Sequence, residues 1–502
     1  MISVKIPPEA AGCKLIKYLS KQGYSIAADC GGKGTCGKCR VKMLSGSFYK
    51  DSEMSCLLEP DSDNYVKSCR AWCSEQGAEI LIPEADSTDQ IALSLGDSLE
   101  YSSADESAES VRYGIALDIG TTTLAMASIA IKEDTYEIIQ TVSRLNPQRS
   151  FGADVMSRIT AASEGQLLAM QEVLLSEIRS MLDSLRVKAD IMTVVANPTM
   201  LHIFCGVSPE RMGAYPFIPE FTDMKILTGS SLGLPVESVI LLPSASAFIG
   251  ADVIAGCLSV ALTDNAQPVV LIDIGTNGEM MLYTGTDNGG KLYAASSAAG
   301  PAFEGAGITT GVGGIKGAVC AVELHADTLM SHTIGNEEAV GICGSGLIDL
   351  IAVLLSRGDI DETGYLEESP VVYAHGSNRQ LTITEQDVRA FQLAKSAIRA
   401  GLEALIHEAG LKVDDISKVY IAGGLGFYMN IDSSVQVGLI PASLKDKVAV
   451  VGNSALSGAM MFMLRDTIMS REAEKIATEC TTIELNSSDF FTNAFIEYMM
   501  FE

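Results

Sequence analysis

The sequence ALDIGTT at residues 116–122 returns in closely related form as LIDIGTN at residues 271–277. Each copy follows an apolar run and precedes another strand-like segment, so each predicts a strand, a tight turn and a second strand. Glycine permits the tight turn, and the N–H groups and threonine hydroxyl of such a turn can face phosphate oxygens. Asp118 and Asp273 could each orient a hydrated Mg²⁺ ion or a water. The repeat therefore predicts two strand-turn-strand units with matching chemistry.

Apolar strand candidates and helical segments alternate through the rest of this region. Residues 418–422 and 448–451 are apolar runs that end at glycine-containing turns. Between the repeats and these strands, residues 385–410 keep one apolar face at helical spacing, and Thr384 is placed to cap that helix. Alternating strands and helices predict an α/β multidomain protein.

The two turns become more specific when they are considered together with a third glycine loop. The turns lie 155 residues apart and are followed by IAGGLG at residues 421–426. This set resembles the two phosphate loops and the adenosine loop of the actin, sugar-kinase and heat-shock-chaperone (ASKHA) superfamily, which implies a duplicated RNase H-like body that binds ATP and Mg²⁺. Glycine turns between buried strands are the plainer alternative.

The resemblance assigns roles residue by residue. It implies catalytic roles for Asp118, Asp273 and Glu279. It implies that three loops contact the nucleotide. The first phosphate turn contains Gly120, Thr121, Thr122 and Thr123, and the second contains Gly275, Thr276 and Asn277. The adenosine loop contains Gly423, Gly424 and Gly426. The segments at residues 243–256 and 452–459 are candidates for the helices on which the two lobes hinge, although small-residue helix contacts would look the same.

A second chemical signal is the crowding of cysteines near the N-terminus. Cys30, Cys36 and Cys39 stand within ten residues of a glycine-rich loop, and Cys69 follows an intervening strand candidate. Four thiolates can hold a [2Fe-2S] cluster, and glycines let main-chain N–H groups approach its sulfurs. Structural zinc is the alternative, but zinc sites usually present two Cys pairs. Cys69 is favoured as the fourth ligand, with Cys73 as its rival.

The remaining histidines and cysteines give no comparable pattern. The five His residues form no ligand cluster. We expect ordinary buried thiols at six further positions, namely Cys13, Cys205, Cys257, Cys320, Cys343 and Cys480.

The bulk composition limits the function classes. The chain of 502 residues has a formal net charge of -28, which argues against a nucleic-acid partner. No apolar run approaches a membrane span, and the N-terminus lacks the features of a signal peptide. We therefore expect a cytoplasmic protein without a membrane partner.

The sequence predicts three segments. Residues 1–83 resemble a β-grasp ferredoxin from which one strand of the opening hairpin is missing. Residues 84–112 are rich in Ser and acidic residues and predict a linker. Residues 113–502 would form the ATP-binding body, with one lobe at about 113–265 plus C-terminal helices and the other at 266–465.

Taken together, the motifs resemble the reductive activators of corrinoid proteins, which include the activating enzymes of anaerobic O-demethylases. The match rests on the cysteine loop at 30–39, both phosphate turns, the glycines of the adenosine loop, and the stretches at 146–148, 152–155, 298–306 and 452–453. The resemblance implies ATP-dependent transfer of one electron from the cluster to Co(II), which regenerates Co(I). It also implies a corrinoid partner from a methyltransferase system and an upstream electron donor, and it leaves a homodimer open.

Two expectations concern the parts between these motifs. Larger relatives insert a middle domain before the Asp118 turn, and here we expect only the acidic linker at that place. The loop at residues 296–310, with Phe303 and Glu304, is a candidate for the surface that faces the corrinoid, with a phosphate-side or dimer-contact loop as the alternative.

Three other functions remain compatible with the residues. The chain could activate another low-potential metalloenzyme, although such activators of the same ATPase fold usually carry a [4Fe-4S] cluster. It could be a small-molecule kinase with an appended ferredoxin, or an ATP-binding scaffold that senses redox state. ATP hydrolysis without a phosphoryl acceptor would exclude the kinase.

Overall fold

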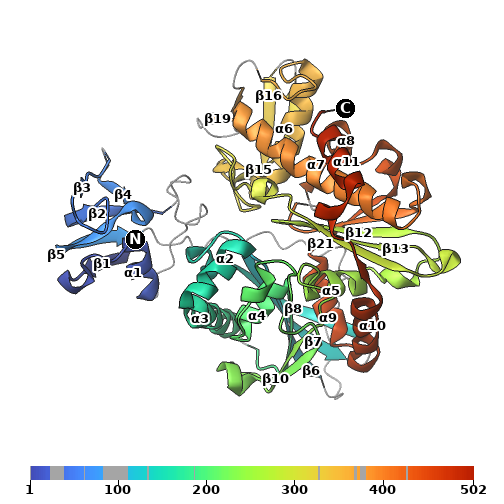
Figure 1. Cartoon of the computed structure of the whole chain (residues 1–502), viewed down its shortest axis with the longest axis horizontal. Coiled ribbons are helices and arrows are strands. Elements are labelled where there is room, and N and C mark those ends of the chain that lie inside the picture. The colour runs from blue at the N-terminus through green and yellow to red at the C-terminus, as the bar shows by residue number, and fades with distance from the viewer. Residues whose placement is uncertain are drawn as a thin grey trace.

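The computed structural model describes residues 2–22, 39–61, 63–82, 111–132, 135–185, 187–325, 328–366, 370–373, 380–425 and 428–501. Figure 1 shows the chain coloured from its blue N-terminus to its red C-terminus. The predicted linker at 84–112 falls almost wholly outside the described residues, as do Cys30, Cys36 and Gly426.

The N-terminal module is a small antiparallel sheet packed on one helix. Its strands run in the order β1-β5-β2-β3, and β4 pairs with β2. Fully buried Leu15, Leu19 and Phe48 lie in its core. Strand β1 leads through a short 3-10 helix into α1 without a hairpin partner within residues 2–22, which confirms the missing opening strand. The elements are β1 (Ile2–Ile6), η1 (Pro8–Ala10), α1 (Leu15–Lys21), β2 (Arg40–Tyr49), β3 (Leu57–Leu58), β4 (Tyr65–Lys67), η2 (Ser68–Arg70) and β5 (Trp72–Ile82).

The first half of the body, lobe I, is built on a six-stranded sheet in the order β10-β11-β9-β6-β7-β8. Strands β6, β7 and β8 form an antiparallel meander, and β9 lies parallel to β6. The elements are β6 (Arg112–Ile119), β7 (Thr123–Lys132), β8 (Thr135–Leu145), α2 (Val155–Ala161), α3 (Leu167–Leu185), β9 (Ile191–Ala196), α4 (Pro198–Phe204), β10 (Lys225–Thr228), β11 (Ser238–Leu241) and α5 (Ala251–Ser259).

The second half, lobe II, repeats this topology. Its sheet runs β21-β20-β12-β13-β14-β22, again with an antiparallel meander (β12, β13, β14) and a parallel neighbour, β20. The strands are β12 (Val269–Ile274), β13 (Gly278–Tyr283), β14 (Leu292–Ser297), β20 (Lys418–Ala422), β21 (Val448–Gly452) and β22 (Thr481–Thr482). This correspondence confirms the duplicated α/β body that the repeated turns predict.

Lobe II also carries a second, smaller sheet and several helices. That sheet contains β15 (Ala318–His325), β16 (Thr328–Thr333), β17 (Gly341–Ile342), β18 (Val371–Tyr373) and β19 (Gln380–Thr382). The helices are η9 (Pro301–Glu304), α6 (Gly344–Arg357), α7 (Glu385–Glu408), α8 (Ile431–Gln436) and α11 (Asp489–Glu497). Helix α7 begins where the sequence predicts, because Thr384 and Asp387 form a reciprocal capping box.

Two helices that follow the lobe II strands return to lobe I. In Figure 1 the red helices α9 (Ser454–Phe462) and α10 (Asp466–Glu479) lie beside α5, β6 and β7, and their apolar residues share the lobe I core. Helices α5 and α9 cross closely, since a Cβ at Gly458 would lie 1.9 Å from the carbonyl oxygen of Ala255. These are the two segments in which the sequence predicts connecting helices.

Candidate functional site

The first phosphate turn follows β6 and is fixed from several sides. Asp118 stands one residue before the end of β6, and its Oδ2 accepts a hydrogen bond of 2.9 Å from Asn453 Nδ2. The Asn453 side chain also caps α9, because its Oδ1 accepts from the N–H of Leu456. A Cβ at Gly120 would lie 2.7 Å from the carbonyl oxygen of Thr123, so the turn is as tight as its glycine suggests.

The stretch at residues 146–158 supports this turn from behind. Asn146 Nδ2 donates to the carbonyl oxygen of Gly120 at 2.8 Å. Arg158 is fully buried, and its guanidinium donates to the carbonyl oxygens of Thr121 and Gly152 and to Gln148 Oε1. The stretch at residues 146–158 therefore has a structural task, which is to hold the main chain of the first turn in place.

The second phosphate turn and the adenosine loop meet in lobe II. Asp273 lies opposite Glu279 in the β12–β13 register, and the N–H of Gly275 donates to the carbonyl oxygen of Asn277 at 2.9 Å. Gly423 has φ +94°, and a Cβ there would meet the Ile274 carbonyl oxygen at 2.4 Å. Among the described residues, nothing lies within 4 Å of a Cβ built on Gly424, so the described part of the protein leaves space beside the loop at that residue.

Half-buried carboxylates from both lobes influence one another's protonation. Burial and the neighbouring Asp252 carboxylate raise the pKa of Asp118 to about 7, against the effect of the Asn453 hydrogen bond. Burial, Asp252 and Asp118 raise the pKa of Asp273 to about 7. Burial likewise raises the pKa of Asp252 to about 6, and it holds the pKa of Glu279 well above the usual range, with Asp252 and Asp273 adding to the effect. A cation bound among these carboxyl groups would favour their charged forms and lower these pKa values, so the group suits a cation.

Glu304 joins the two phosphate turns. Its Oε2 accepts hydrogen bonds from Thr122 Oγ1 at 3.1 Å and from Thr276 Oγ1 at 2.6 Å. Phe303 is only 4% exposed and packs edge to face against Phe391. The expectation that these two residues face the corrinoid is wrong, because Phe303 belongs to the core and Glu304 points to the phosphate turns.

In the N-terminal module, two of the predicted cluster ligands lie together. Cys39 and Cys69 are both buried, and their Sγ atoms are 3.2 Å apart. Cys73 lies instead beside Cys13, because its N–H donates a main-chain hydrogen bond of 2.9 Å to the Cys13 carbonyl oxygen. Cys13 is exposed, contrary to the expectation of a buried thiol. It sits in the turn before α1, where its neighbours rather than its own side chain fill the core.

The other five predicted ordinary thiols are less uniform than expected. Cys257, Cys320 and Cys343 are buried, whereas Cys205 and Cys480 are half-buried. Within the described residues, no group of three or more His, Cys, Asp or Glu is placed to hold a metal ion directly. The predicted ligands Cys30 and Cys36 lie outside those residues.

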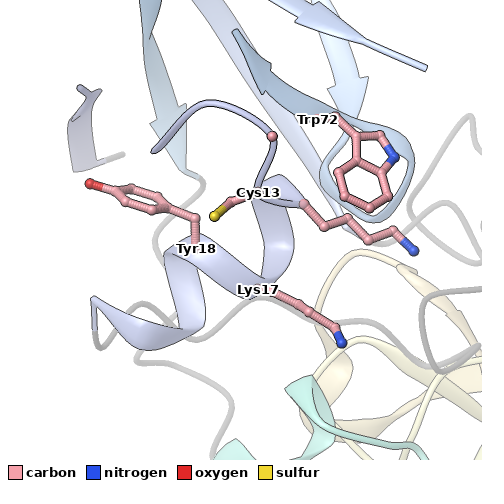
Figure 2. A pocket seen from close by; sticks show the side chains of 6 residues that line it. Cys13, Lys17, Tyr18 and Trp72 are labelled. Atoms are coloured by element: carbon pink, nitrogen blue, oxygen red, sulfur yellow. The ribbon is translucent and has the colours of Figure 1, made fainter. Parts of the chain in front are cut away.

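A pocket of about 440 Å³ adjoins α1 in the same module. Figure 2 shows Lys17 and Tyr18 extending from α1 in opposite directions, with Cys13 and Trp72 between and above them. Trp72 stands three residues after Cys69, and the N–H of Leu15 donates to the carbonyl oxygen of Ala71 at 2.8 Å. The pocket is therefore close in the chain to the paired thiols.

Sequence reasoning missed several residues that shape the cleft. Arg158 gives no signal in the sequence, because a lone arginine on a helix normally reads as a surface charge. Asp252 belongs to the predicted hinge segment at 243–256, but the sequence does not predict it as a site residue. The nearby Gly250 is a signal for close main-chain approach, because a Cβ there would lie 2.6 Å from the Ala196 carbonyl oxygen. Asn197 also contributes, since its Nδ2 donates to Thr121 Oγ1 at 3.2 Å.

Comparison with known families agrees with this division of the chain. Residues 4–74 match the 2Fe-2S iron-sulfur cluster binding domain, residues 113–265 match the RACo middle region, and residues 267–502 match the C-terminal domain of RACo, the ASKHA domain. The matched middle region begins at residue 113 and contains the first phosphate turn, so it does not lie before the Asp118 turn, and the expectation that only the acidic linker stands there stays a prediction. The module thus carries a [2Fe-2S] domain and the body a nucleotide-binding fold.

Individual relatives point the same way. The corrinoid activation enzyme RamQ of Eubacterium limosum is 32% identical over 429 residues, which cover 78% of this chain and 70% of the relative. The [Co(II) methylated amine-specific corrinoid protein] reductase of Methanosarcina barkeri is 28% identical, with 76% of each chain covered. The solved structure of a reductive activator for corrinoid, iron-sulfur protein is 26% identical, has a TM-score of 0.72, and covers 99% of this chain and 96% of its own.

One further observation concerns membranes. Within the part of the chain that the structure describes, no helix combines the length and apolarity that crossing a bilayer requires.

With its iron-sulfur module, its duplicated ASKHA body and its extended similarity to corrinoid activation enzymes, the chain belongs to the family of reductive activators of corrinoid proteins.

Proposed function

We propose that this protein uses ATP to transfer one electron from its [2Fe-2S] cluster to Co(II) in a corrinoid protein, giving Co(I). The corrinoid protein would belong to an anaerobic methyltransferase or O-demethylase system in the cytoplasm. The observation that carries the proposal is the cleft in which both phosphate turns share Glu304, on the same chain as the paired thiols of Cys39 and Cys69.

The cluster would be held by Cys30, Cys36, Cys39 and Cys69. The paired Sγ atoms of Cys39 and Cys69 support this set, and the position of Cys73 beside Cys13 favours Cys69 over Cys73. When bound, such a cluster supplies a one-electron couple with a reduction potential of about -400 mV. The burial of both described thiols excludes water from this side of the site.

The nucleotide would lie between the lobes. The turns at 120–123 and 275–277 would bind phosphates through N–H and hydroxyl groups, and the glycines at 423, 424 and 426 would lie against adenosine. Asp118, Asp273 and Glu279 would hold a hydrated Mg²⁺ and orient the attacking water. Mg²⁺ usually keeps several waters and binds through one or two carboxylates plus phosphates, which fits a carboxylate cleft without a direct three-ligand site among the described residues.

ATP is needed because reducing Co(II) in a corrinoid is harder than reducing the cluster. A nucleotide can bias this transfer only if it binds two conformations with different affinities. The lobes meet at the Glu304 and Asn453 contacts, and α5 and α9 cross beside them, so closing on ATP would change the surface that the body offers to its partner. Tighter docking would change cobalt ligation, and hydrolysis would release the partner.

The test is to measure Co(I) formation spectroscopically with the reduced protein and a corrinoid protein, with and without MgATP. We expect ATP to raise the extent of reduction in the wild type and to have little effect in the Asp273→Asn variant. Equal extents with and without ATP in the wild type would contradict the coupling.

An upstream donor must reload the cluster, and we propose that it docks at the pocket beside α1. Lys14 and Lys17 line this pocket with Trp72. Residues 1–82 contain eleven Lys and Arg against nine Asp and Glu, a net charge of +2 in a chain of net charge -28. An acidic electron-carrier protein would be attracted to this module and repelled by the body.

The donor proposal is tested with the Lys14→Glu/Lys17→Glu double variant. We expect slower cluster reduction by reduced flavodoxin at low salt and unchanged reduction by photoreduced deazaflavin. Lys5→Glu is the control, because Lys5 is exposed between buried Val4 and Ile6 and so points away from the core and α1. Equal rates with flavodoxin in all three proteins would refute this docking face.

A further inference from the structure

The contact that joins the two lobes across the phosphate turns is made by a carboxylate. Glu304 belongs to lobe II, where it ends η9. One of its oxygens accepts from Thr276 Oγ1 of its own lobe and from Thr122 Oγ1 of lobe I, at 2.6 and 3.1 Å. The two hydroxyls that the proposed function assigns to phosphate thus already bind an anionic oxygen that the protein supplies.

The main chain around Glu304 holds it in this position. Gly300 and Gly305 flank η9 with φ values of +78° and +77°. A Cβ at Gly305 would lie 2.2 Å from the Val312 carbonyl oxygen, so the segment is tightly packed on that side. Phe303 anchors the same segment in the core against Phe391. Glu304 is therefore a fixed part of the cleft rather than a surface side chain that reaches it by chance.

Hydrogen bonds and charges from both lobes act on the Glu304 carboxylate. Burial raises the pKa of Glu304, and the hydrogen bonds from Thr276 and Thr122 and the charges of Arg149 and Arg158 act in the opposite direction. Its charge also adds to the rise in the pKa of Asp273 on the same lobe. A carboxylate and a phosphate oxygen accept hydrogen bonds from the same donors, and both are anions, so the two would compete for these hydroxyls.

We propose that Glu304 occupies a phosphate position in the nucleotide-free protein, tying the lobes through Thr122 and Thr276, and that a nucleotide phosphate displaces it. This inference rests on the proposed nucleotide cleft and assigns Glu304 a positioning role. Displacement frees η9 from lobe I, so the arrival of phosphate is passed to the segment that contains Phe303 and packs on α7.

Nucleotide affinity gives the first test. The anaerobically purified full-length wild type, the Glu304→Gln variant and the Glu338→Gln variant are titrated calorimetrically with adenosine, MgADP and a non-hydrolysable MgATP analogue. Glu338 is exposed and serves as the matched control. We expect Glu304→Gln to bind the triphosphate about tenfold more tightly, because a competing anion is removed, and to bind adenosine unchanged. The control should match the wild type.

Other results would overturn the inference. If Glu304→Gln bound the triphosphate no more tightly than the wild type, no competition would exist. Lost hydrolysis with unchanged affinity would make Glu304 a catalytic residue instead. An equal gain for adenosine and triphosphate would show a general loosening of the cleft and no contest with phosphate.

A nucleotide-free measurement separates this inference from the proposed function. Thermal unfolding of Thr122→Val, Glu304→Gln and the double variant forms a double-mutant cycle. We expect the decrease in Tm of the double variant to be smaller than the sum of the decreases in the two single variants, because both changes remove the same interlobe contact. Additive losses would refute the contact. A wild type that binds no adenine nucleotide but shows this coupling would refute the proposed function and the displacement step, while the tie between the lobes would stand.

Discussion

Replacing Gly458 with alanine would force apart the two helices that cross beneath the cleft. The new Cβ would lie 1.9 Å from the Ala255 carbonyl oxygen and 2.4 Å from its carbonyl carbon. Because these are main-chain atoms of α5, no side chain can turn aside. The helices would have to separate by about 1 Å or more to restore ordinary van der Waals distances.

The magnitude follows from two opposing effects. Overpacking a well-packed contact costs about 1–3 kcal/mol, and the rigidity of main-chain atoms places this case in the upper half of the range. Alanine recovers about 1 kcal/mol of helix propensity relative to glycine. We expect a net loss of about 1–2 kcal/mol, which lowers Tm by roughly 1–2.5 °C in a body of this size.

The same displacement should weaken nucleotide binding. Asp252 stands in the first turn of α5, and Asn453, which donates to Asp118, caps α9, so separating the helices moves both carboxylates. Calorimetric Tm with and without a MgATP analogue measures both effects. Ser457→Ala is the control, because it changes the same helix turn without a clash. A Tm for Gly458→Ala at or above that of the wild type would refute the reasoning.

Three other perturbations test separate parts of the site. Cys69→Ser should abolish the absorption and paramagnetic signals of a reduced [2Fe-2S] cluster while Cys73→Ser keeps them, and the reverse pattern would exchange their roles. The pKa values of Asp118 and Asp273 are raised to about 7, so the folded state holds more protons than the unfolded state between about pH 4 and 7. The stability of the nucleotide-free protein should therefore fall as pH rises through this window. Thermal scans from pH 5.5 to 8 should show a shallower fall for Asp273→Asn, and an identical fall would exclude this carboxylate as a source. Arg158→Met leaves buried carbonyl groups without their donor, so it should lower the free energy of unfolding by about 3–5 kcal/mol and weaken ATP binding. A variant with wild-type Tm would contradict a supporting role for the guanidinium.

The elements that the sequence predicts well are those whose local pattern and tertiary role agree. Strand β20 spans residues 418–422 as predicted, and α7 begins at the predicted cap because Thr384 and Asp387 satisfy each other's main-chain N–H groups. The repeated turns predict the duplicated sheets, since each turn joins the first two strands of an equivalent antiparallel meander.

The parts that sequence could not give depend on contacts between distant segments. Glu304 lies 182 residues from Thr122, and Asn453 lies 335 residues from Asp118, so no local pattern shows that either pair meets. The small residues of the loop at 296–310 favour a surface that faces the corrinoid, but small residues allow close packing of the protein on itself equally well. The full burial of Arg158 likewise depends on three carbonyl and amide oxygens brought together by folding.

The position of Trp72 has a practical consequence. It is the only tryptophan in the chain, and it follows Cys69 by three residues. Indole emission from this protein therefore arises entirely beside the thiol pair, where an iron-sulfur chromophore would quench it by energy transfer. The emission of a purified sample should thus report what fraction of the molecules lacks iron, without any label and without interference from the large tryptophan-free body.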